Sequence, residues 1–210
     1  MRVCFYIDGF NLYHKIAELP DKTAPDKSLR WLDLRCLVEK LRFRANEEIM
    51  AIYYFSAFAN WRPSESKQRH EAYVKALLSR EVRVILGNFK EKSAKCSKCS
   101  YSWRKHEEKE SDVNLALQVV QDAYEDKYDC AYIVSADSDM IPAIRMVKAK
   151  FPQKEICVIF PPNSGGTKNI KQVVDSSKKI TLQQISSCLF PPVLCDETGI
   201  LITRRPKEWR

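Results

Sequence analysis

Two carboxylates placed two residues apart suggest the chemistry of this chain. Asp137 and Asp139 follow the β-branched and aromatic run 132–134, which predicts a buried strand, and they precede a helical pattern over 140–150. In open α/β sheets, ligands bind at the carboxyl ends of the strands. Both side chains could face a hard cation there, because such ions prefer oxygen ligands. The competing interpretation is that either aspartate only caps the following helix.

Two further aspartates are expected at the same edge of the sheet. Asp8 ends the apolar run 2–7, Asn11 comes three residues later, and Asp112 lies in the first turn of a predicted helix. If the four aspartates converge, they repel one another, and burial raises their pKa values. A divalent cation removes this cost, and carboxylates with water suit Mg²⁺ or Mn²⁺ rather than zinc. Such an ion can bind a phosphodiester oxygen and lower the pKa of a bound water, which would be the nucleophile.

Strands and helices alternate along the chain, which predicts a doubly wound, mainly parallel sheet flanked by helices. We expect one domain over residues 1–190, with a basic, cysteine-containing insertion at about 90–109 and a C-terminal tail over 191–210. Gly87 is expected to end the third strand. The predicted strands cover residues 2–7, 49–58, 82–86, 130–134 and 155–160, and residues 178–181 could form a last short strand.

Composition narrows the class of partner. The formal charge of the 210 residues is +8, which favours nucleic acid and, more weakly, an acidic membrane surface. No apolar run approaches the roughly 18 residues of a membrane span, and no signal peptide is apparent, so we expect a cytoplasmic protein. Neither G-x-x-x-x-G-K-[ST] nor G-x-G-x-x-G occurs, so a P-loop or dinucleotide site is not indicated. No serine–histidine nucleophile pair is apparent, and His70 is expected to face solvent.

Six of the eight cysteines fall into two groups. One group is expected to behave as small buried hydrophobes with reduced thiols, and it comprises Cys4, Cys36, Cys130 and Cys157. Cys96 and Cys99 differ, because their spacing is that of half a zinc site. His106 could be a third ligand. The alternative is two free, exposed thiols.

Basic and aromatic residues alternate around this cysteine pair. Basic charge with interleaved aromatics suits a nucleic-acid backbone and its stacked bases. The alternative is a solvated charged surface whose aromatics pack locally. The candidate nucleic-acid-binding residues are Lys90, Lys95, Lys98, Tyr101, Trp103, Arg104 and Lys105.

Three segments together resemble the motifs of the NYN domain family, a PIN-like group that includes LabA-like proteins. They are Tyr6-Ile7-Asp8-Gly9-Phe10-Asn11, Lys109-Glu110-Ser111-Asp112-Val113-Asn114-Leu115-Ala116 and Val134-Ser135-Ala136-Asp137-Ser138-Asp139. Their order and spacing match over roughly residues 1–175. The resemblance implies a PIN-like, five-stranded sheet of order 3-2-1-4-5 and a metal-dependent nuclease, most often acting on RNA. By position, Asp8, Asp112 and Asp137 would be metal ligands. Asp139 would be a ligand or a supporting carboxylate, and Asn11 a positioning group.

Three functional hypotheses therefore stand. The first is a Mg²⁺- or Mn²⁺-dependent endoribonuclease, with Zn²⁺ as a possible further ion at the cysteine pair. The second is a non-catalytic RNA-binding or regulatory adaptor with the same fold, and the third is a DNA nuclease. The acidic residues favour an enzyme, because a pure binder of polyanions gains nothing from clustered carboxylates. RNA is the expected partner ahead of DNA, a membrane is not expected, and no protein partner is predicted.

Overall fold

The computed structural model describes residues 1–19, 27–165 and 168–209. Its strands are β1 (Arg2–Asp8), β2 (Glu48–Ala57), β3 (Val82–Lys95), β4 (Ser102–Lys109), β5 (Cys130–Val134), β6 (Glu155–Phe160), β7 (Ser176–Lys179), β8 (Val193–Cys195) and β9 (Leu201–Arg204). Its α-helices are α1 (Gly9–Ala17), α2 (Leu34–Leu41), α3 (Ser64–Leu78), α4 (Ser111–Tyr124), α5 (Ile141–Lys150), α6 (Lys168–Lys171) and α7 (Leu182–Ser186). Short 3₁₀ turns are η1 (Lys27–Arg30), η2 (Ser138–Met140) and η3 (Lys207–Trp209).

The central sheet has seven strands in the order β4-β3-β2-β1-β5-β6-β7. Every neighbouring pair is parallel except β3 and β4, which are antiparallel. The α/β class is therefore confirmed, but the sheet as a whole is not the expected five-stranded one of order 3-2-1-4-5, and the count of five is wrong. The five predicted strands, which are β1, β2, β3, β5 and β6, keep that relative order at its centre. The sheet gains β4 at one edge, because the basic insertion folds back on β3, and β7 at the other edge.

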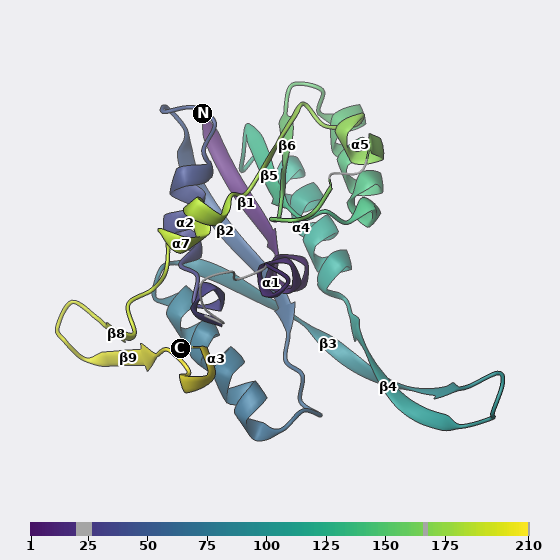
Figure 1. Ribbon diagram of the computed structural model, residues 1–210. Helices are drawn as coiled ribbons and strands as arrows, with labels where there is room; N and C mark the ends of the chain where they lie inside the picture. The colour runs from purple at the N-terminus through teal and green to yellow at the C-terminus, as the bar shows by residue number, and fades with distance from the viewer. Residues whose placement is uncertain (20–26, 166–167, 210) are drawn as a thin grey trace.

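Gly87 does not end the third strand as the sequence predicted. β3 continues through it to Lys95 and forms a long hairpin with β4, which projects away from the body (Figure 1). A side chain at Gly87 would place its Cβ 2.5 Å from the backbone oxygen of Lys109. The glycine is therefore needed because the end of β4 lies very close to β3 at this point.

Both faces of the sheet are covered, which explains the continuous apolar runs of its central strands. Successive residues of β1 alternate between two cores: Val3, Phe5 and Ile7 face one, and Cys4 and Tyr6 face the other. Side chains of α1, α2, α3 and α7 fill the first core, and those of α4, α5 and α6 fill the second. Figure 1 shows these two groups of helices on either side of the strands.

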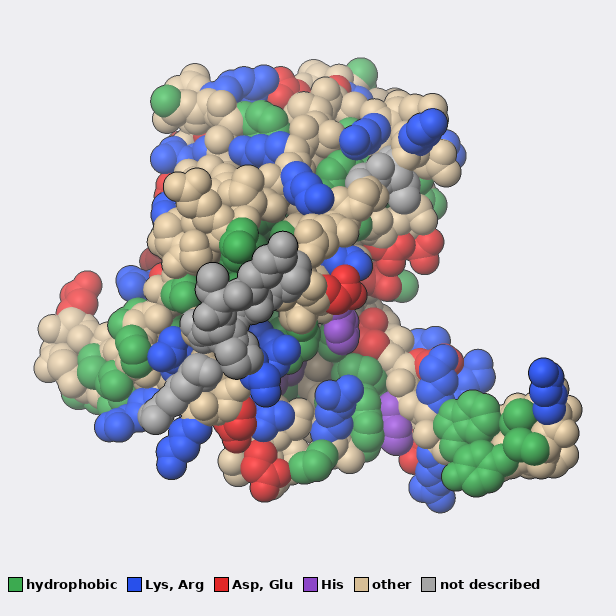
Figure 2. All heavy atoms as spheres, in the orientation of Figure 1, with side chains coloured by type: hydrophobic (Ala, Val, Ile, Leu, Met, Phe, Trp, Pro, Cys, Tyr) green, Lys and Arg blue, Asp and Glu red, His purple; other side chains and the backbone are tan. Residues whose placement is uncertain are grey.

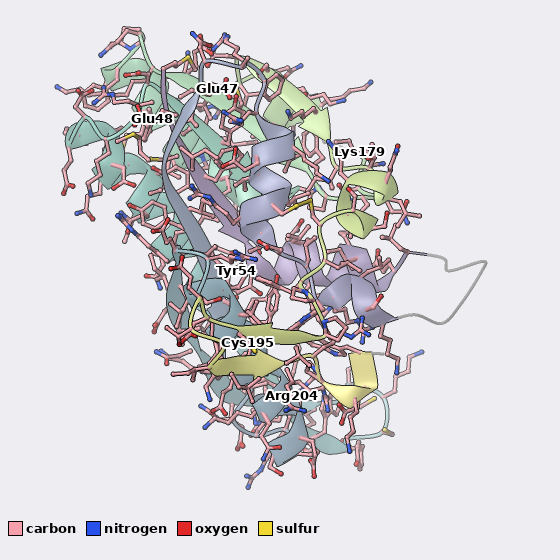
Figure 3. The ribbon with its side chains drawn as sticks, turned by 90° about the vertical axis from the view of Figure 1, so that its left-hand side faces the viewer. Glu47, Glu48, Tyr54, Lys179, Cys195 and Arg204 are labelled. Carbon is pink, nitrogen blue, oxygen red and sulfur yellow. A yellow bond between two sulfur atoms is a disulfide. The ribbon has the colours of Figure 1, made fainter. Side chains whose placement is uncertain are left out.

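The residues expected as a C-terminal tail pack on the helix α3. The hydroxyl of Thr203 in β9 donates a hydrogen bond to the backbone oxygen of Ala72 at 3.3 Å. Trp209 is 5% exposed, and its ring lies 6.2 Å from Trp31 and 6.0 Å from Tyr73. In Figure 3, Cys195 and Arg204 mark the two strands of this hairpin, which crosses the lower part of the molecule.

Three of the four cysteines expected to be buried thiols are confirmed as such, and they are Cys4, Cys130 and Cys157. Cys36 is not: it forms a disulfide with Cys188, which joins α2 to the segment after α7. The two residues are 152 positions apart, so no local pattern could pair them. Within the described ranges, no helix is both long and apolar enough to cross a membrane.

Candidate active site

Asp8 lies at the carboxyl end of the central strand, at the edge where the chain turns into helices. β1 and β5 are parallel, with Ile7 opposite Val134, so the residues that follow these two meet. One carboxylate oxygen of Asp8 accepts a hydrogen bond from the hydroxyl of Ser135 at 2.9 Å, and the other accepts one from the backbone of Asn11 at 2.9 Å. Asp8 is 6% exposed, and burial raises the pKa of its carboxyl, although these two hydrogen bonds oppose the shift.

Gly9 explains why α1 can begin directly after this strand. A Cβ at this position would lie 2.5 Å from the Tyr54 ring and 2.6 Å from the backbone oxygen of Phe55. Any side chain here would push the start of the helix, and Asp8 with it, away from the sheet.

Asn11 and Ser135 together hold the turn that carries Asp137. The side-chain oxygen of Asn11 accepts a hydrogen bond from the backbone of Ala136 at 3.1 Å, and the hydroxyl of Ser135 accepts one from the backbone of Asp137 at 3.0 Å. Asp137 in turn accepts a hydrogen bond from the backbone of Asp139 at 2.9 Å. The capping interpretation thus holds for one oxygen of Asp137. Each carboxylate oxygen has two lone pairs, so the cap leaves acceptor capacity for an ion.

Glu108 is a member of this cluster that sequence analysis missed. It accepts a hydrogen bond from the backbone of Ser111 at 3.0 Å and another from the Ser111 hydroxyl, and it thereby supports the first turn of α4. Its charge acts on both Asp8 and Asp112. Its position three residues before a helix start was the available signal, but a lysine-rich insertion was not an obvious source of a site carboxylate.

Asp112 has the strongest electrostatic signature in the cluster. Burial, and after it the neighbouring charges of Asp8, Glu108, Asp137 and Asp139, together raise the pKa of its carboxyl to about 6. Within the described ranges the Asp112 side chain has neither a hydrogen bond nor an ion pair. A carboxylate surrounded by other acids and lacking any donor is a natural partner for a cation.

The donor set suits a hard divalent ion, since it consists of carboxylate oxygens. The side chains that would hold it are Asp8, Asp112 and Asp137, with Asp139 and Glu108 beside them. They are more widely spaced than a closed three-ligand site. Among the described residues, one trio of possible ligands has its atoms all within 4.8 Å, and it is Cys130, Glu155 and Cys157. Mg²⁺ commonly keeps several of its waters, and these can bridge a wider carboxylate cluster.

The trio of Cys130, Glu155 and Cys157 could hold a metal ion, but it lies away from the aspartates. Cys130 and Glu155 pair in register at the starts of β5 and β6, at the end of the strands opposite to the aspartates. Both oxygens of Glu155 accept hydrogen bonds from the guanidinium of Arg44, at 3.0 and 3.2 Å. Its two thiols make it a softer donor set than the aspartate cluster.

Two hollows flank the acidic cluster, and Glu108 lines both. The first has a volume of about 380 Å³, and its walls are largely aromatic. The second, of about 580 Å³, runs between α4 and α5 and includes Asp112 and Asp139. Figure 2 shows hydrophobic, basic and histidine side chains gathered between the body and the base of the hairpin.

His70 lines the first hollow, so its expected orientation toward solvent is wrong. Its Nε2 lies 3.3 Å from the hydroxyl of Ser56, and its ring packs edge-on against Phe58 at 4.8 Å. Burial lowers the pKa of this histidine to about 4, so it is neutral at pH 7. The orientation of His70 could not be predicted from α3, because the helix has few apolar residues to indicate which face is buried.

The hairpin separates the two parts of the predicted zinc site. Lys95 and Ser102 form the last pair before the tip that holds Cys96 and Cys99, whereas His106 pairs with Glu91. His106 is thus about 13 Å along the strand from the start of β4, at about 3.3 Å per residue. It stacks instead on Trp61, with ring centroids 4.3 Å apart. His106 therefore cannot complete a site with the two cysteines.

The candidate nucleic-acid-binding residues lie on the same hairpin. Lys90, Lys95 and Lys98 are exposed and have no ion pair with any residue that the structure describes. Two others are partly neutralised: Arg104 pairs with Glu91 at 3.2 Å, and Lys105 pairs with Glu107 at 3.1 Å. The rings of Tyr101 and Trp103 stack at 6.2 Å and are 68% and 44% exposed. Figure 2 shows this green patch with blue side chains around it.

Comparisons with known proteins bear on the family and the fold of the chain. The family model described as NYN domain matches residues 2–179. The chain is similar to 6-hydroxy-3-succinoylpyridine 3-monooxygenase HspA of Pseudomonas putida, with 28% identity over all of this chain and 75% of that protein. A crystal structure of a protein of unknown function from Vibrio parahaemolyticus aligns with a TM-score of 0.58 and 16% identity, over 90% of this chain and 96% of that chain. This last likeness shows the fold alone.

Proposed function

Because the chain belongs to the NYN domain family, a family of PIN-like nucleases, we propose that it is a Mg²⁺- or Mn²⁺-dependent endoribonuclease that hydrolyses phosphodiester bonds. The observation that carries the proposal is the Asp112 carboxylate, which lacks a hydrogen-bond donor among the described residues and faces four other acids. In a protein that only bound RNA, such a cluster would lower the affinity, since carboxylates repel phosphate. The adaptor hypothesis finds no comparable support.

The residues of the site divide into ligands and groups that position them. Asp8, Asp112 and Asp137 hold the divalent ion, with Asp139 close by. When bound, this ion supplies charge stabilisation at the phosphodiester and a water of lowered pKa. Asn11 fixes the turn after β5 through its hydrogen bond to the Ala136 backbone.

Two supporting residues complete this arrangement. Ser135 holds Asp8 and the Asp137 backbone at once, through hydrogen bonds of 2.9 and 3.0 Å. Glu108 adds negative charge at the entrance to the cluster while fixing the start of α4. Neither residue needs to contact the ion to influence where its ligands stand.

Incubation of the purified protein with labelled single-stranded RNA and DNA, with Mn²⁺ or with EDTA, tests the proposal. We expect RNA cleavage with Mn²⁺, none with EDTA, and none from the Asp137→Asn variant. DNA cleavage at an equal rate would replace the ribonuclease by a DNA nuclease. RNA binding without cleavage under any metal would favour the adaptor, and equal cleavage by wild type and variant would expose a contaminant.

We propose that the hairpin holds the phosphodiester chain of the substrate. Replacing Lys95 and Lys98 with Ala should weaken RNA binding and reduce the slope of log K against log salt by about 1.4, at about 0.7 for each lost single-strand phosphate contact. Fluorescence anisotropy between 50 and 200 mM salt measures this slope. The matched control is Lys75→Ala with Lys150→Ala. These two exposed lysines lie near the carboxyl ends of α3 and α5, away from the hairpin. If both pairs change the slope equally, the hairpin does not lie on the substrate path.

Zinc at the hairpin tip is a separate proposal. Backbone groups of Cys99 and Lys98 hydrogen-bond to the Cys96 sulfur and lower the pKa of its thiol, which favours the thiolate that metals require. Cys96 and Cys99 supply two of the four ligands that Zn²⁺ normally takes. Elemental analysis of the purified protein tests this: a Cys96→Ser variant should lose bound zinc, and zinc-free wild type would refute it.

A further inference from the structure

The aromatic hollow beside the acidic cluster is lined by residues to which the proposed hydrolysis assigns no role. Its volume of about 380 Å³ is at the lower end of the range for small-molecule sites, so it suits a single ring system rather than a peptide. All three histidines of the chain line it, although they come from distant segments. Its remaining lining is built from α1, β2, α3, the base of the hairpin and the C-terminal Trp209.

One wall of this hollow offers flat aromatic surfaces. Trp61, in the loop after β2, is 37% exposed and packs edge-on against Phe89 of β3 at 4.2 Å. Phe89 also contacts Phe10 of α1 edge-on at 5.6 Å. His106 stacks on Trp61 and fixes that ring against the hairpin. Such rings can receive a planar base by stacking.

The hollow is also lined by polar groups that carry no charge at pH 7, Ser56 and His70. Ser56 is 2% exposed and lies 3.3 Å from Nε2 of His70, and the two groups can exchange donor and acceptor roles. A neutral imidazole and a hydroxyl can hydrogen-bond the edge of a heterocycle. A purely apolar ligand would form no hydrogen bond with either group.

Cations stand at the rim, where an anionic group of the ligand would lie. Arg62, Lys67 and Arg69 all line the hollow. Lys67 is paired with Glu71 at 3.8 Å, and Arg69 with Glu208 at 3.6 Å. Arg62 is exposed and forms no ion pair with any residue inside the described ranges, so it is free to meet a phosphate.

The hollow and the acidic cluster share a boundary. Gly9, which lines the hollow, directly follows Asp8, and Glu108 lines the hollow while its charge acts on Asp8 and Asp112. A ligand that fills the hollow is therefore a neighbour of any phosphodiester held at the aspartates. Adjacent parts of one nucleotide could therefore occupy the hollow and the acidic cluster.

We propose that this hollow is a base subsite, which takes one unstacked base of the nucleotide next to the scissile phosphodiester. The base stacks against the aromatic wall around Trp61, its edge meets Ser56 and His70, and its phosphate meets Arg62. The placement next to a scissile bond rests on the proposed nuclease function, whereas the binding of a nucleotide does not. The subsite would give the enzyme a preference for particular bases near the cleavage position.

Calorimetric titration in EDTA tests the subsite without any hydrolysis. The probes are the four ribonucleoside 5′-monophosphates, and ribose 5-phosphate is the matched ligand that has the phosphate but no base. We expect at least one nucleotide to bind wild type roughly 5- to 150-fold more tightly than ribose 5-phosphate, as stacking of one base implies. Trp61→Ala should remove most of this difference, and Ser56→Ala, a smaller change that keeps the fold, should alter the ranking of the four nucleotides. Tyr124→Ala, an exposed aromatic on α4, should change neither result.

Three outcomes overturn the subsite. Nucleotides could bind no better than ribose 5-phosphate, or the difference could survive Trp61→Ala. Pyridine-3-carboxylate could also bind more tightly than every nucleotide, which would make the hollow a site for a free heteroaromatic acid. Conversely, nucleotide binding that depends on Trp61 in a protein that cleaves no RNA would support the subsite and refute the nuclease.

Discussion

Replacing Asp112 with Asn is expected to abolish metal-dependent cleavage and, in the same protein, to raise the melting temperature. Activity should fall by at least about 100-fold, because a catalytic divalent ion is worth several kcal/mol of transition-state stabilisation. The amide keeps the size of the side chain but removes the charge that attracts the ion. Activity falls while stability rises, because the negative charge of Asp112 attracts the ion but destabilises the folded protein when no ion is bound.

The sign of the stability effect follows from the pKa of Asp112. It is about 6 in the folded protein, against an ordinary value of 3.8, so the folded state binds more protons between these pH values. Metal-free wild type therefore loses stability as the pH rises from about 4 to about 6, and the loss is complete at pH 7. The Asn variant does not titrate, so its advantage is greatest at pH 7 and vanishes below about pH 4.

Thermal unfolding in EDTA at pH 7 and at pH 4 measures this difference. Because Asp112 is only partly buried, we expect a gain of about 2–4 °C at pH 7, which corresponds to about 1 kcal/mol for a chain of this size. The matched control is Glu125→Gln at the far end of the same helix. Lys127 and Gln121 lower the pKa of Glu125, so its replacement should give no gain. A destabilised Asp112→Asn variant at pH 7 would show that the carboxylate has a stabilising partner.

Sequence patterns predicted the part of the site that depends on strand ends. The edge of a parallel sheet collects the residues that follow its strands, so Asp8 and Asp137 could be placed together before any coordinates. Asn11 was also expected to position a group, and its side chain does hold the turn at Ala136. Asp112 was expected at the same end of the sheet because it lies in the first turn of a helix, and the family resemblance added its role as a metal ligand.

The parts that escaped prediction depend on contacts between distant segments. Glu108 enters the cluster from the end of β4, which pairs with β3 just beyond Gly87. His70 appears polar and exposed on a helix with few apolar residues, but Ser56 and Phe58 of another segment enclose it. The same reason explains the extra strand β4: a basic, aromatic segment can pair with a neighbour or remain a loop, and periodicity cannot distinguish these.

Removal of the Asp122 carboxylate is expected to cause the largest loss of stability of any change considered. Asp122 is fully buried, and it accepts hydrogen bonds from the Tyr6 hydroxyl at 2.8 Å, from Gln118 at 2.8 Å and from Lys127 at 3.0 Å. Asp122→Ala should lower the free energy of unfolding by about 3 kcal/mol, since breaking a buried pair costs about 3–5 kcal/mol and the Lys127 side chain can still reach water. Urea denaturation followed by circular dichroism measures it.

The double variant Tyr6→Phe with Asp122→Ala separates the hydrogen bond from simple loss of volume. In the single variant the Tyr6 hydroxyl is left buried without a partner, whereas the double variant removes both groups. We therefore expect the double variant to be at least as stable as Asp122→Ala alone. Strictly additive losses would mean that the two groups do not interact. Tyr6 precedes Asp8 by two residues, and Asp122 lies on the helix that begins beside Asp112. The network thus fixes α4 against β1, and through them the spacing of the aspartates on which the ion would depend.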